Sequence, residues 1–291
     1  MRGFVFAALL TAAAVFPPVL QAEPLVKKGV SLELVSEHTA IVPGQPLTLG
    51  LILRHEPAFH TYWRQPGIVG LAPELRWTLP EGFSAGEILW PEPERTHMAI
   101  YEVWGYERDV CLAVPMTAPA TLDPKATPSL TFTAKATWMA CGETCHPGVA
   151  DLEITLPVRT EKIAPTEAAP WFAKTRSEQA VADPQWKTSA VYDPGSGFVL
   201  SIVPPEGKAV PQDVYFYSYA RLVDSNAPQK LERLPDGSAR LKLALIESPD
   251  EIAETLDGEL WSAGGWKKAE DGTVRRMLAI KAQLAALAVG K

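Results

Sequence analysis

The sequence is poor in cysteine, lacks any extended basic segment and, beyond its first residues, has no apolar run long enough to span a membrane. Its 291 residues include 3 cysteines, and Lys and Arg number 27 against 34 Asp and Glu, for a formal charge of −7. Because binding to a phosphate backbone requires a concentrated basic face, we expect no nucleic acid among the partners. Glycine-rich phosphate loops, nucleophile elbows and paired-carboxylate motifs are also missing, which argues against the enzymes that use them.

Proline is the residue in excess. The 27 prolines among 291 residues amount to about 9%, against a typical ~5%. Because proline removes a backbone donor and clashes with the preceding helical turn, few long helices fit between them. An all-helical protein and a regular βαβ enzyme are therefore both disfavoured. With 47% hydrophobic and 21% charged residues, the composition is that of a folded protein.

The first 22 residues are predicted to be a secretory signal peptide. Arg2 gives a basic start, residues 4–15 are almost continuously apolar, and Ala22 offers a small residue for cleavage, which is the three-part layout of such a signal. A membrane span needs ~20 apolar residues, and Pro17-Pro18 interrupts this run early; a retained membrane anchor is the alternative. We expect a soluble protein exported to a bacterial periplasm, where cysteines meet an oxidising environment.

The rest of the chain consists of short alternating or β-rich stretches separated by turns. They include residues 30–35, 47–53, 130–134 and 150–156 before one polar break, and 198–203, 214–219 and 239–245 after it. Such period-2 patterning is typical of β-sandwiches. We predict an all-β fold of two consecutive β-sandwich domains: a first domain at 23–160, a linker at 161–183 with a short helix over 169–181, and a smaller second domain at 184–291.

Cys141 and Cys145 carry the clearest chemical signal. They stand between two strand patterns, so we place them at the tip of a hairpin. Opposed strand positions are ~4.5–5.5 Å apart at Cα, within the ~4.4–6.8 Å that a disulfide needs. A disulfide that closes so short a loop stabilises the fold only weakly, because it removes little entropy from the unfolded chain. At an exposed tip, a partner's thiolate can attack it. A purely structural hairpin disulfide is the alternative.

Other sulfur and imidazole groups bear on this site. His146 follows Cys145 directly and could lower the pKa of a thiol or hydrogen-bond a thiolate; an incidental histidine is the alternative. Cys111 lies in an apolar strand pattern, so we expect a buried and inert thiol. The two hairpin thiols with Met98, Met139 and His146 form a soft ligand set suited to Cu(I), whereas four converging zinc ligands cannot be assembled from this spacing.

Five stretches of the first half stand out together. They are His60-Thr61-Tyr62-Trp63-Arg64-Gln65-Pro66-Gly67, Gly70-Leu71-Ala72-Pro73, Leu89-Trp90-Pro91-Glu92-Pro93, Trp104-Gly105-Tyr106-Glu107 and the loop from Cys141 to Pro147. In combination they resemble the amino-terminal periplasmic domains of DsbD-type disulfide reductases, and particularly the copper-sensitivity suppressor ScsB branch. The resemblance covers residues from about 30 to 158, and the motifs of the second half are faint.

The resemblance implies immunoglobulin-like β-sandwiches, two in succession in the ScsB branch, and a redox pair formed by the two hairpin cysteines. That pair would take electrons from a membrane-embedded reductase hub or a thioredoxin-like protein and pass them to oxidised periplasmic proteins, with no cofactor besides the disulfide. In relatives a short loop caps the pair; its candidate here is residues 97–104, with Met98, Ile100 and Tyr101 as covering side chains. Relatives continue into a transmembrane core and a thioredoxin-like domain that this sequence lacks, so we expect either a separate hub or another use of the same domain.

The sequence leaves three functional hypotheses. The first is a periplasmic thiol–disulfide interchange protein, an oxidoreductase component of the protein-disulfide reductase type that relays electrons through Cys141 and Cys145. The second is a copper-tolerance protein that binds Cu(I) through the same cysteines. The third is a non-redox interaction module in which the disulfide is structural.

Overall fold

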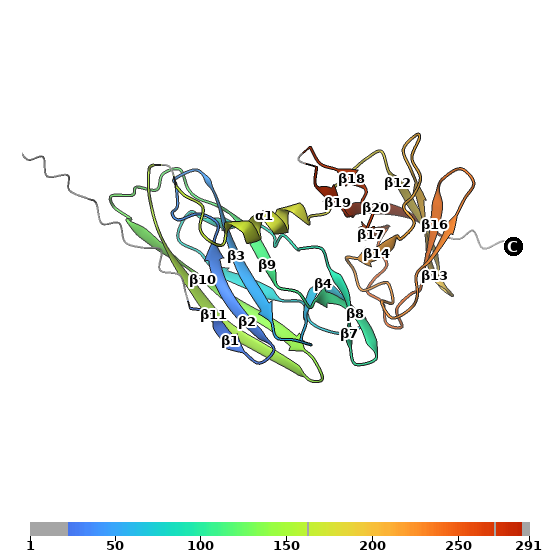
Figure 1. Cartoon of the computed structure of the whole chain (residues 1–291), viewed down its shortest axis with the longest axis horizontal. Helices are drawn as coiled ribbons and strands as arrows, with labels where there is room; N and C mark the ends of the chain where they lie inside the picture. The colour runs from blue at the N-terminus through green and yellow to red at the C-terminus, as the bar shows by residue number, and fades with distance from the viewer. Residues whose placement is uncertain (1–22, 162, 271, 287–291) are drawn as a thin grey trace, which may run out of the picture.

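The computed structural model describes residues 23–161, 163–270 and 272–286, and the signal peptide predicted at residues 1–22 lies outside them. Within these ranges the fold is mostly β, with two β-sheet bodies and one short helix (Figure 1). The first body contains the strands up to residue 157, and the second contains those from residue 187 onward. No helix in the described ranges is long and apolar enough to cross a membrane.

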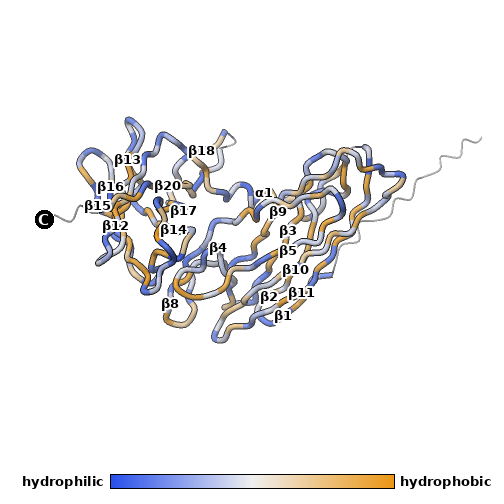
Figure 2. Tube along the Cα trace, turned by 180° about the vertical axis from the view of Figure 1, so that it is seen from behind, coloured by the Kyte–Doolittle hydropathy of each residue, from blue (hydrophilic) through white to orange (hydrophobic). Residues whose placement is uncertain are grey.

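The first body contains two larger sheets that share one apolar core. One sheet has the order β1 (Leu25–Lys27), β2 (Val30–Ser36), β3 (Pro46–His55), β9 (Val110–Thr117) and β6 (Ser84–Ala85). The other has the order β11 (Cys145–Pro157), β10 (Ser129–Cys141) and β5 (Glu74–Thr78). Leu32, Leu34, Phe132 and Ile154 are among the side chains buried in the shared core. The alternation in the sequence thus marks the core-facing side of each strand, and Figure 2 shows apolar segments recurring along the strands of this body.

A third, smaller sheet of the first body positions the candidate site. It has the order β4 (Thr61–Gly67), β8 (Tyr101–Tyr106) and β7 (Glu94–Met98), and Figure 1 shows it on the side of the first body that faces the second. The pairing of β4 with β8 shifts register between Tyr62 and Gly67. A bridge between His60 and Cys141 joins β4 to the end of β10. The sheet is therefore tied to the cysteine hairpin through the backbone.

Helix α1 (Ala169–Ser177) lies in the segment predicted to be a linker. Phe172 is fully buried in a cluster with Val35, Ile52 and Cys111, so the helix covers the outer face of the first sheet. This cover explains why β3 is apolar on both of its faces. The helix ends earlier than the predicted residue 181, because Val181 forms a parallel bridge to Leu278 of the second body.

The second body consists of one seven-stranded sheet and a two-stranded ribbon. The sheet has the order β14 (Tyr215–Ser218), β17 (Thr255–Trp261), β20 (Met277–Ala286), β12 (Lys187–Asp193), β13 (Gly197–Val203), β16 (Ala239–Leu243) and β15 (Lys230–Arg233). The ribbon is β18 (Lys267–Lys268) with β19 (Val274–Arg275). Strand β12 pairs antiparallel with β13 and parallel with β20. The hydrogen bonding is therefore continuous across the seven-stranded sheet.

Aromatic side chains join the two bodies. The ring centroids of Trp63 and Trp104 in the first body lie 5.7 and 5.4 Å from that of Tyr217 in the second, and all three residues are buried. The guanidinium of Arg64 lies 4.1 Å from the ring centroid of Tyr219. Because these first-body residues come from β4 and β8, the second body rests on the same small sheet that contacts the cysteine hairpin.

Candidate functional site

Cys141 and Cys145 form a disulfide at the end of the β10–β11 hairpin. The two strands pair in continuous register from Ser129 opposite Pro157 to Cys141 opposite Cys145, and the two Cα atoms are 4.1 Å apart. The long ladder fixes which residues face each other at the tip. The hairpin placement expected from the sequence is thus observed, and the pairing excludes Cys111 from the bond.

The two halves of the disulfide have opposite environments. Cys141 is fully buried, whereas Cys145 is exposed. The cluster around Cys141 contains Tyr62 and Val103, with Met98 and Met139 packed against it. Attack by an external thiolate requires access to a sulfur, so Cys145 is the half of the bond that a partner can reach.

Tyr62 contacts the buried sulfur directly. Its phenol donates a hydrogen bond to the Cys141 Sγ across 3.0 Å, and paired backbone bonds of 2.9 Å between His60 and Cys141 hold β4 at this position. The ring lies over Gly70, where a Cβ would be 2.2 Å from the nearest ring carbon and φ is +110°, so only glycine fits there. Burial raises the pKa of Tyr62 to about 12, and the hydroxyl therefore keeps its proton and acts as a donor.

The proposed cap residues lie on the β7–β8 hairpin. Met98 is half-buried and packs against the Cys141 cluster, while Ile100 and Tyr101 are 78% and 37% exposed. Ala99, at the turn, has φ of +56°, a left-handed conformation that is unusual for alanine. The structure therefore brings one of the three candidates to the cysteine pair and leaves the other two on the surface beyond it.

His146 is held away from the sulfurs. Its Nε2 is 2.9 Å from the hydroxyl oxygen of Thr144, and its ring centroid is 5.9 Å from that of Phe59. Successive residues of a strand point to opposite faces, so the imidazole lies on the other face of the hairpin from the Cys145 side chain. His60, which sequence reasoning quoted but assigned no role, is the buried histidine beside the site, and burial lowers its pKa.

Cys111 lies far from this chemistry. It is 1% exposed on β9 beneath α1, and the hydroxyl of Thr175 donates to its backbone carbonyl across 2.8 Å. Burial raises the pKa of its thiol to about 12, so the thiolate is scarce at neutral pH. The free cysteine is buried, as expected from its apolar strand pattern.

Two contacts of the site were missed by sequence reasoning. Tyr62 was quoted only as part of a motif, and Val103 was not singled out although it lies inside the segment considered as a cap. The signal that could have found Tyr62 is its place between His60 and Gly67, in the motif that runs beside the cysteine hairpin in the fold. Within the described ranges, no group of three or more His, Cys, Asp or Glu side chains is arranged to hold a metal ion.

The comparisons with known proteins agree with this geometry. Residues 31–157 match the family described as "Thiol:disulfide interchange protein DsbD, N-terminal". The chain is also similar to the crystal structure of the N-terminal periplasmic domain of ScsB from Proteus mirabilis, with 16% identity and a TM-score of 0.59 over 92% of this chain and 100% of that one. At this identity the likeness shows the fold alone.

A second solved structure, the periplasmic chaperone SfaE, aligns with 87% of this chain and 99% of its own at 10% identity. Its TM-score of 0.22 is too low to carry an argument. No curated protein matches the sequence.

Proposed function

Residues 31–157 form a DsbD N-terminal domain, and on that premise we propose that the chain is a thiol–disulfide interchange protein that relays electrons through Cys141 and Cys145. The observation that carries the proposal is the asymmetric disulfide, with one cysteine exposed and the other buried beneath Tyr62. The donor is a membrane-embedded thiol reductase hub or a thioredoxin-like protein, and the acceptors are oxidised periplasmic proteins. The similar ScsB domain is periplasmic, which supports the same location for this chain.

Reduction of the disulfide proceeds in two exchanges. A donor thiolate attacks the Cys145 sulfur, a donor–Cys145 bond forms, and Cys141 leaves as a thiolate with the electron pair of the broken bond. The donor's second thiolate then attacks the donor sulfur that is bonded to Cys145, and Cys145 is released as a thiolate. The donor departs as a disulfide, and the chain takes up two protons from solvent to hold two thiols.

Transfer to an acceptor reverses this order. The Cys145 thiolate attacks the acceptor's disulfide, and the resulting mixed disulfide is resolved when the Cys141 thiolate attacks the Cys145 sulfur. The acceptor leaves with two thiols, and the Cys141–Cys145 bond is restored. Cys145 is the partner-facing residue in this scheme because it is the exposed one.

Two single cysteine variants test the proposal. Reduced Cys141→Ser and Cys145→Ser chains are each mixed with an oxidised thioredoxin-like protein, and covalent complexes are resolved by non-reducing electrophoresis. We expect Cys141→Ser to accumulate a mixed disulfide, because the chain keeps no second thiol at the site to complete the transfer and only the acceptor's own thiol can reverse it, and Cys145→Ser to form little. Cys111→Ser is the matched control and should exchange like the wild type. Equal trapping by both variants would refute the assigned polarity.

The wild-type chain supplies the complementary measurement. Thiols are counted by mass spectrometry after alkylation, before and after mixing with the oxidised thioredoxin-like protein, and the reduction potential is determined against a dithiol buffer. Structural disulfides have potentials below about −300 mV, so an interchange protein should lie above that value. A lower potential together with no thiol transfer would support a structural disulfide instead.

Cu(I) binding is a second candidate function, and the position of two methionines favours it. Met98 and Met139 both pack against the cluster that contains Cys141, which brings two thioethers close to the thiols of the reduced site. Such soft ligands suit Cu(I). The reduced chain should then retain Cu(I) against a competing chelator, the oxidised chain should not, and a Met98→Ala/Met139→Ala variant should bind more weakly. Thiol exchange without copper retention would leave only the first function.

We also infer that both bodies are immunoglobulin-like β-sandwiches, with a first domain at residues 23–160, a linker at 161–183 and a second domain at 184–291. The strand bounds support this division, because β11 ends at Pro157 and β12 begins at Lys187. Limited proteolysis should therefore yield stable fragments with ends between these two residues. Cleavage inside the β10–β11 hairpin before the linker would contradict it.

A further inference from the structure

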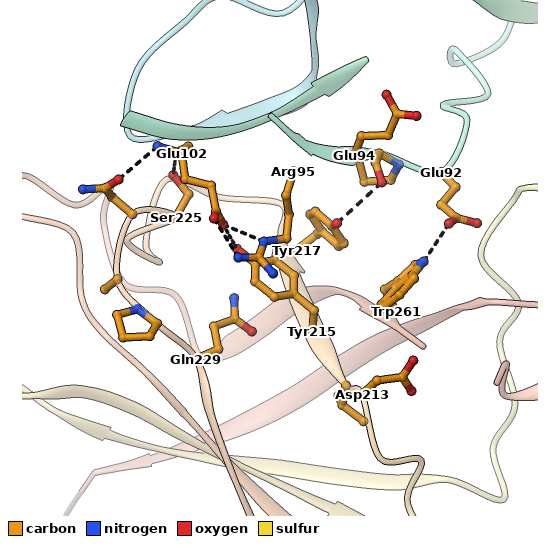
Figure 3. Close-up of a pocket in the computed structure, with 15 residues that line it drawn as sticks. Glu92, Glu94, Arg95, Glu102, Asp213, Tyr215, Tyr217, Ser225, Gln229 and Trp261 are labelled. Atoms are coloured by element: carbon orange, nitrogen blue, oxygen red, sulfur yellow. Dashed lines mark hydrogen bonds and ion pairs between the residues drawn. The ribbon is translucent and has the colours of Figure 1, made fainter. Parts of the chain in front are cut away.

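A loop of the second body, residues 224–229, binds the hairpin that covers the buried cysteine (Figure 3). The hydroxyl of Ser225 donates to the backbone carbonyl of Glu102 across 2.6 Å and accepts from the backbone N–H of Ile68 across 3.1 Å. The side-chain oxygen of Asn226 accepts from the backbone N–H of Glu102 across 3.0 Å. Both backbone groups of one β8 residue are therefore held by the other body.

The side chain of Glu102 is held as well. The guanidinium of Arg95 donates to both of its carboxylate oxygens at 2.7 Å, and the hydroxyl of Tyr215 donates to one of them at 3.1 Å. The same guanidinium lies 4.7 Å from the ring centroid of Tyr215. These groups border a cavity of about 650 Å³ between the bodies, and Figure 3 shows them converging on Glu102.

The approach of this loop requires a special backbone on the first body. Gly67 has φ of +92°, and a Cβ there would be 2.3 Å from the Ser225 hydroxyl oxygen. A larger residue would displace the serine, so the close approach depends on glycine. Ser225 is 1% exposed, and its two hydrogen bonds are formed out of water, where leaving the backbone partners unsatisfied is costly.

The clamped strand leads directly to the buried sulfur. Val103, the residue after Glu102, is fully buried against Cys141, and Met98 at the end of the paired strand packs on the same cluster. We propose that Ser225 and Asn226 of the second body are positioning residues that hold the β7–β8 hairpin over Cys141. This inference rests on the proposed function, because it explains how exchange is confined to Cys145.

The chemical consequence concerns the reduced state. With the hairpin held in place, the Cys141 thiol is shielded from external disulfides and oxidants, so the first bond to an acceptor forms at Cys145. Cys141 then attacks the adjacent Cys145 sulfur, a step that needs no opening of the cover. When the clamp is lost, local opening of the hairpin exposes Cys141 to reagents that otherwise reach only Cys145.

Alkylation of the reduced full chain tests this role, because each cysteine reports separately. Wild-type, Ser225→Ala and Asn226→Ala chains are treated for short times with iodoacetamide. Modification of each cysteine is then located and measured by tandem mass spectrometry, because Cys141 and Cys145 are 4 positions apart and can share a peptide. We expect the rate at Cys141 to rise about tenfold in Ser225→Ala, because the variant loses two hydrogen bonds of a buried hydroxyl. In Asn226→Ala, whose bond to Glu102 is exposed, we expect a smaller rise of about threefold. The rate at Cys145 should be unchanged in both. Cys111 is buried beneath α1, so a rise in its alkylation rate would indicate a general loosening of the fold.

Matched variants separate positioning from general stability. Asn226→Asp keeps the oxygen that accepts from Glu102 and should restore the wild-type rate at Cys141. Arg275→Ala removes another contact between the bodies, in which the guanidinium donates to the Arg176 carbonyl at the end of α1, and should also behave like the wild type. An unchanged rate at Cys141 in the alanine variants would overturn the proposal. So would a parallel rise at Cys111, or an Asn226→Asp chain that behaves like Asn226→Ala.

This experiment is independent of the relay itself. Alkylation measures only access to each thiol, so it can succeed in a protein that exchanges with no partner. Failure of the relay would appear instead as the absence of a trapped complex with Cys141→Ser. The two proposals can therefore fail separately.

Discussion

The phenol of Tyr62 donates its hydrogen to the Sγ of Cys141 across 3.0 Å, between residues 79 positions apart in the chain. Both side chains are fully buried, and burial raises the pKa of Tyr62 to about 12, so the donor is present at every physiological pH. When the disulfide is reduced, Cys141 becomes a thiolate in an apolar cluster. A charge in such a place is costly unless it is hydrogen-bonded, and Tyr62 supplies that bond.

Replacing Tyr62 with phenylalanine should therefore slow reduction of the disulfide. The ring and its packing over Gly70 remain, while the leaving Cys141 thiolate loses its donor. A hydrogen bond to a charged group contributes about 1.5–3 kcal/mol, so we expect the rate constant for reduction by dithiothreitol to fall about tenfold or more. The measurement is the loss of the disulfide at pH 7, followed by alkylation and mass spectrometry.

Tyr192→Phe provides the matched control for this prediction. Tyr192 lies on β12 of the second body, with its ring against Phe198, and its replacement should leave the rate unchanged. If Tyr62→Phe is reduced as fast as the wild type, the phenol does not stabilise the leaving thiolate.

The sequence was sufficient to predict the cysteine hairpin because that information is local. Alternating residues on both sides of Cys141 and Cys145 define two adjacent strands, and their register brings the sulfurs together. The buried state of Cys111 followed in the same way from its apolar neighbours. In each case the deciding contacts are made within one sheet whose strands can be read from the chain.

The environment of the site could not be read in this way. Tyr62 reaches Cys141 through a single bridge between β4 and β10, and no periodicity in the sequence specifies that contact. Ser225 and Glu102 are 123 positions apart in the chain and belong to different bodies. The sequence motifs of the second half were too faint to suggest their contact. His146 is next to Cys145 in sequence, yet strand alternation and its bond to Thr144 direct it elsewhere.

The two ends of the β7–β8 turn should differ in their effect on Cys141. Met98→Ala removes a side chain that packs against the cysteine cluster, whereas Ile100→Ala changes one that is 78% exposed. In a Cys145→Ser background, we expect Met98→Ala to accelerate oxidation of Cys141 by hydrogen peroxide about fivefold by loosening its cover. Loss of free thiol over time gives the rate, and Ile100→Ala is the control.

Equal rates for the two variants would contradict a covering role for Met98. A larger effect of Ile100→Ala would mean that the exposed turn, and not the packed methionine, controls access to the buried sulfur.

The positive charge near the cysteine hairpin should influence which thiols attack Cys145. Lys27, Lys28 and His146 line a groove of about 340 Å³ that continues from the cysteine hairpin, and both lysines are exposed. Both lysines are changed to glutamate, and the rate of disulfide reduction is measured at low salt with an anionic thiol, 2-mercaptoethanesulfonate, and a cationic one, cysteamine. We expect the rate with the anionic thiol to fall about threefold relative to the rate with the cationic thiol. The ratio of the two rate constants is the measurement, and 0.5 M salt should largely remove the effect.

A second lysine pair supplies the control for this experiment. Lys267 and Lys268 form β18 in the second body and also are exposed, so the same double change alters the net charge equally. An equal response to both double variants would show that net charge, and not the groove, selects the thiol.

The contact between the bodies also contains a carboxyl group that should make stability depend on pH. Glu259 is 8% exposed, accepts a hydrogen bond of 2.7 Å from the Tyr219 hydroxyl, and has a pKa raised to about 7 by burial. Because an unfolded glutamate titrates near 4.3, the folded chain holds the extra proton between these values. The free energy of unfolding should therefore fall as pH rises from about 4.5 to 7, by up to about 3 kcal/mol.

Glu259→Gln isolates this effect, since glutamine is neutral at every pH. At pH 5 the variant and the wild type should have similar urea midpoints, and at pH 7.5 the variant should be the more stable of the two. The comparison is needed because His55, whose pKa burial lowers to about 4, gives the opposite slope: its folded form binds fewer protons, so stability rises as pH increases from about 4 to 6.5. That contribution is common to both chains and cancels in the difference. Parallel midpoints from pH 5 to 7.5 would mean that Glu259 is already ionised at the interface, with Arg64 and Tyr219 compensating its charge.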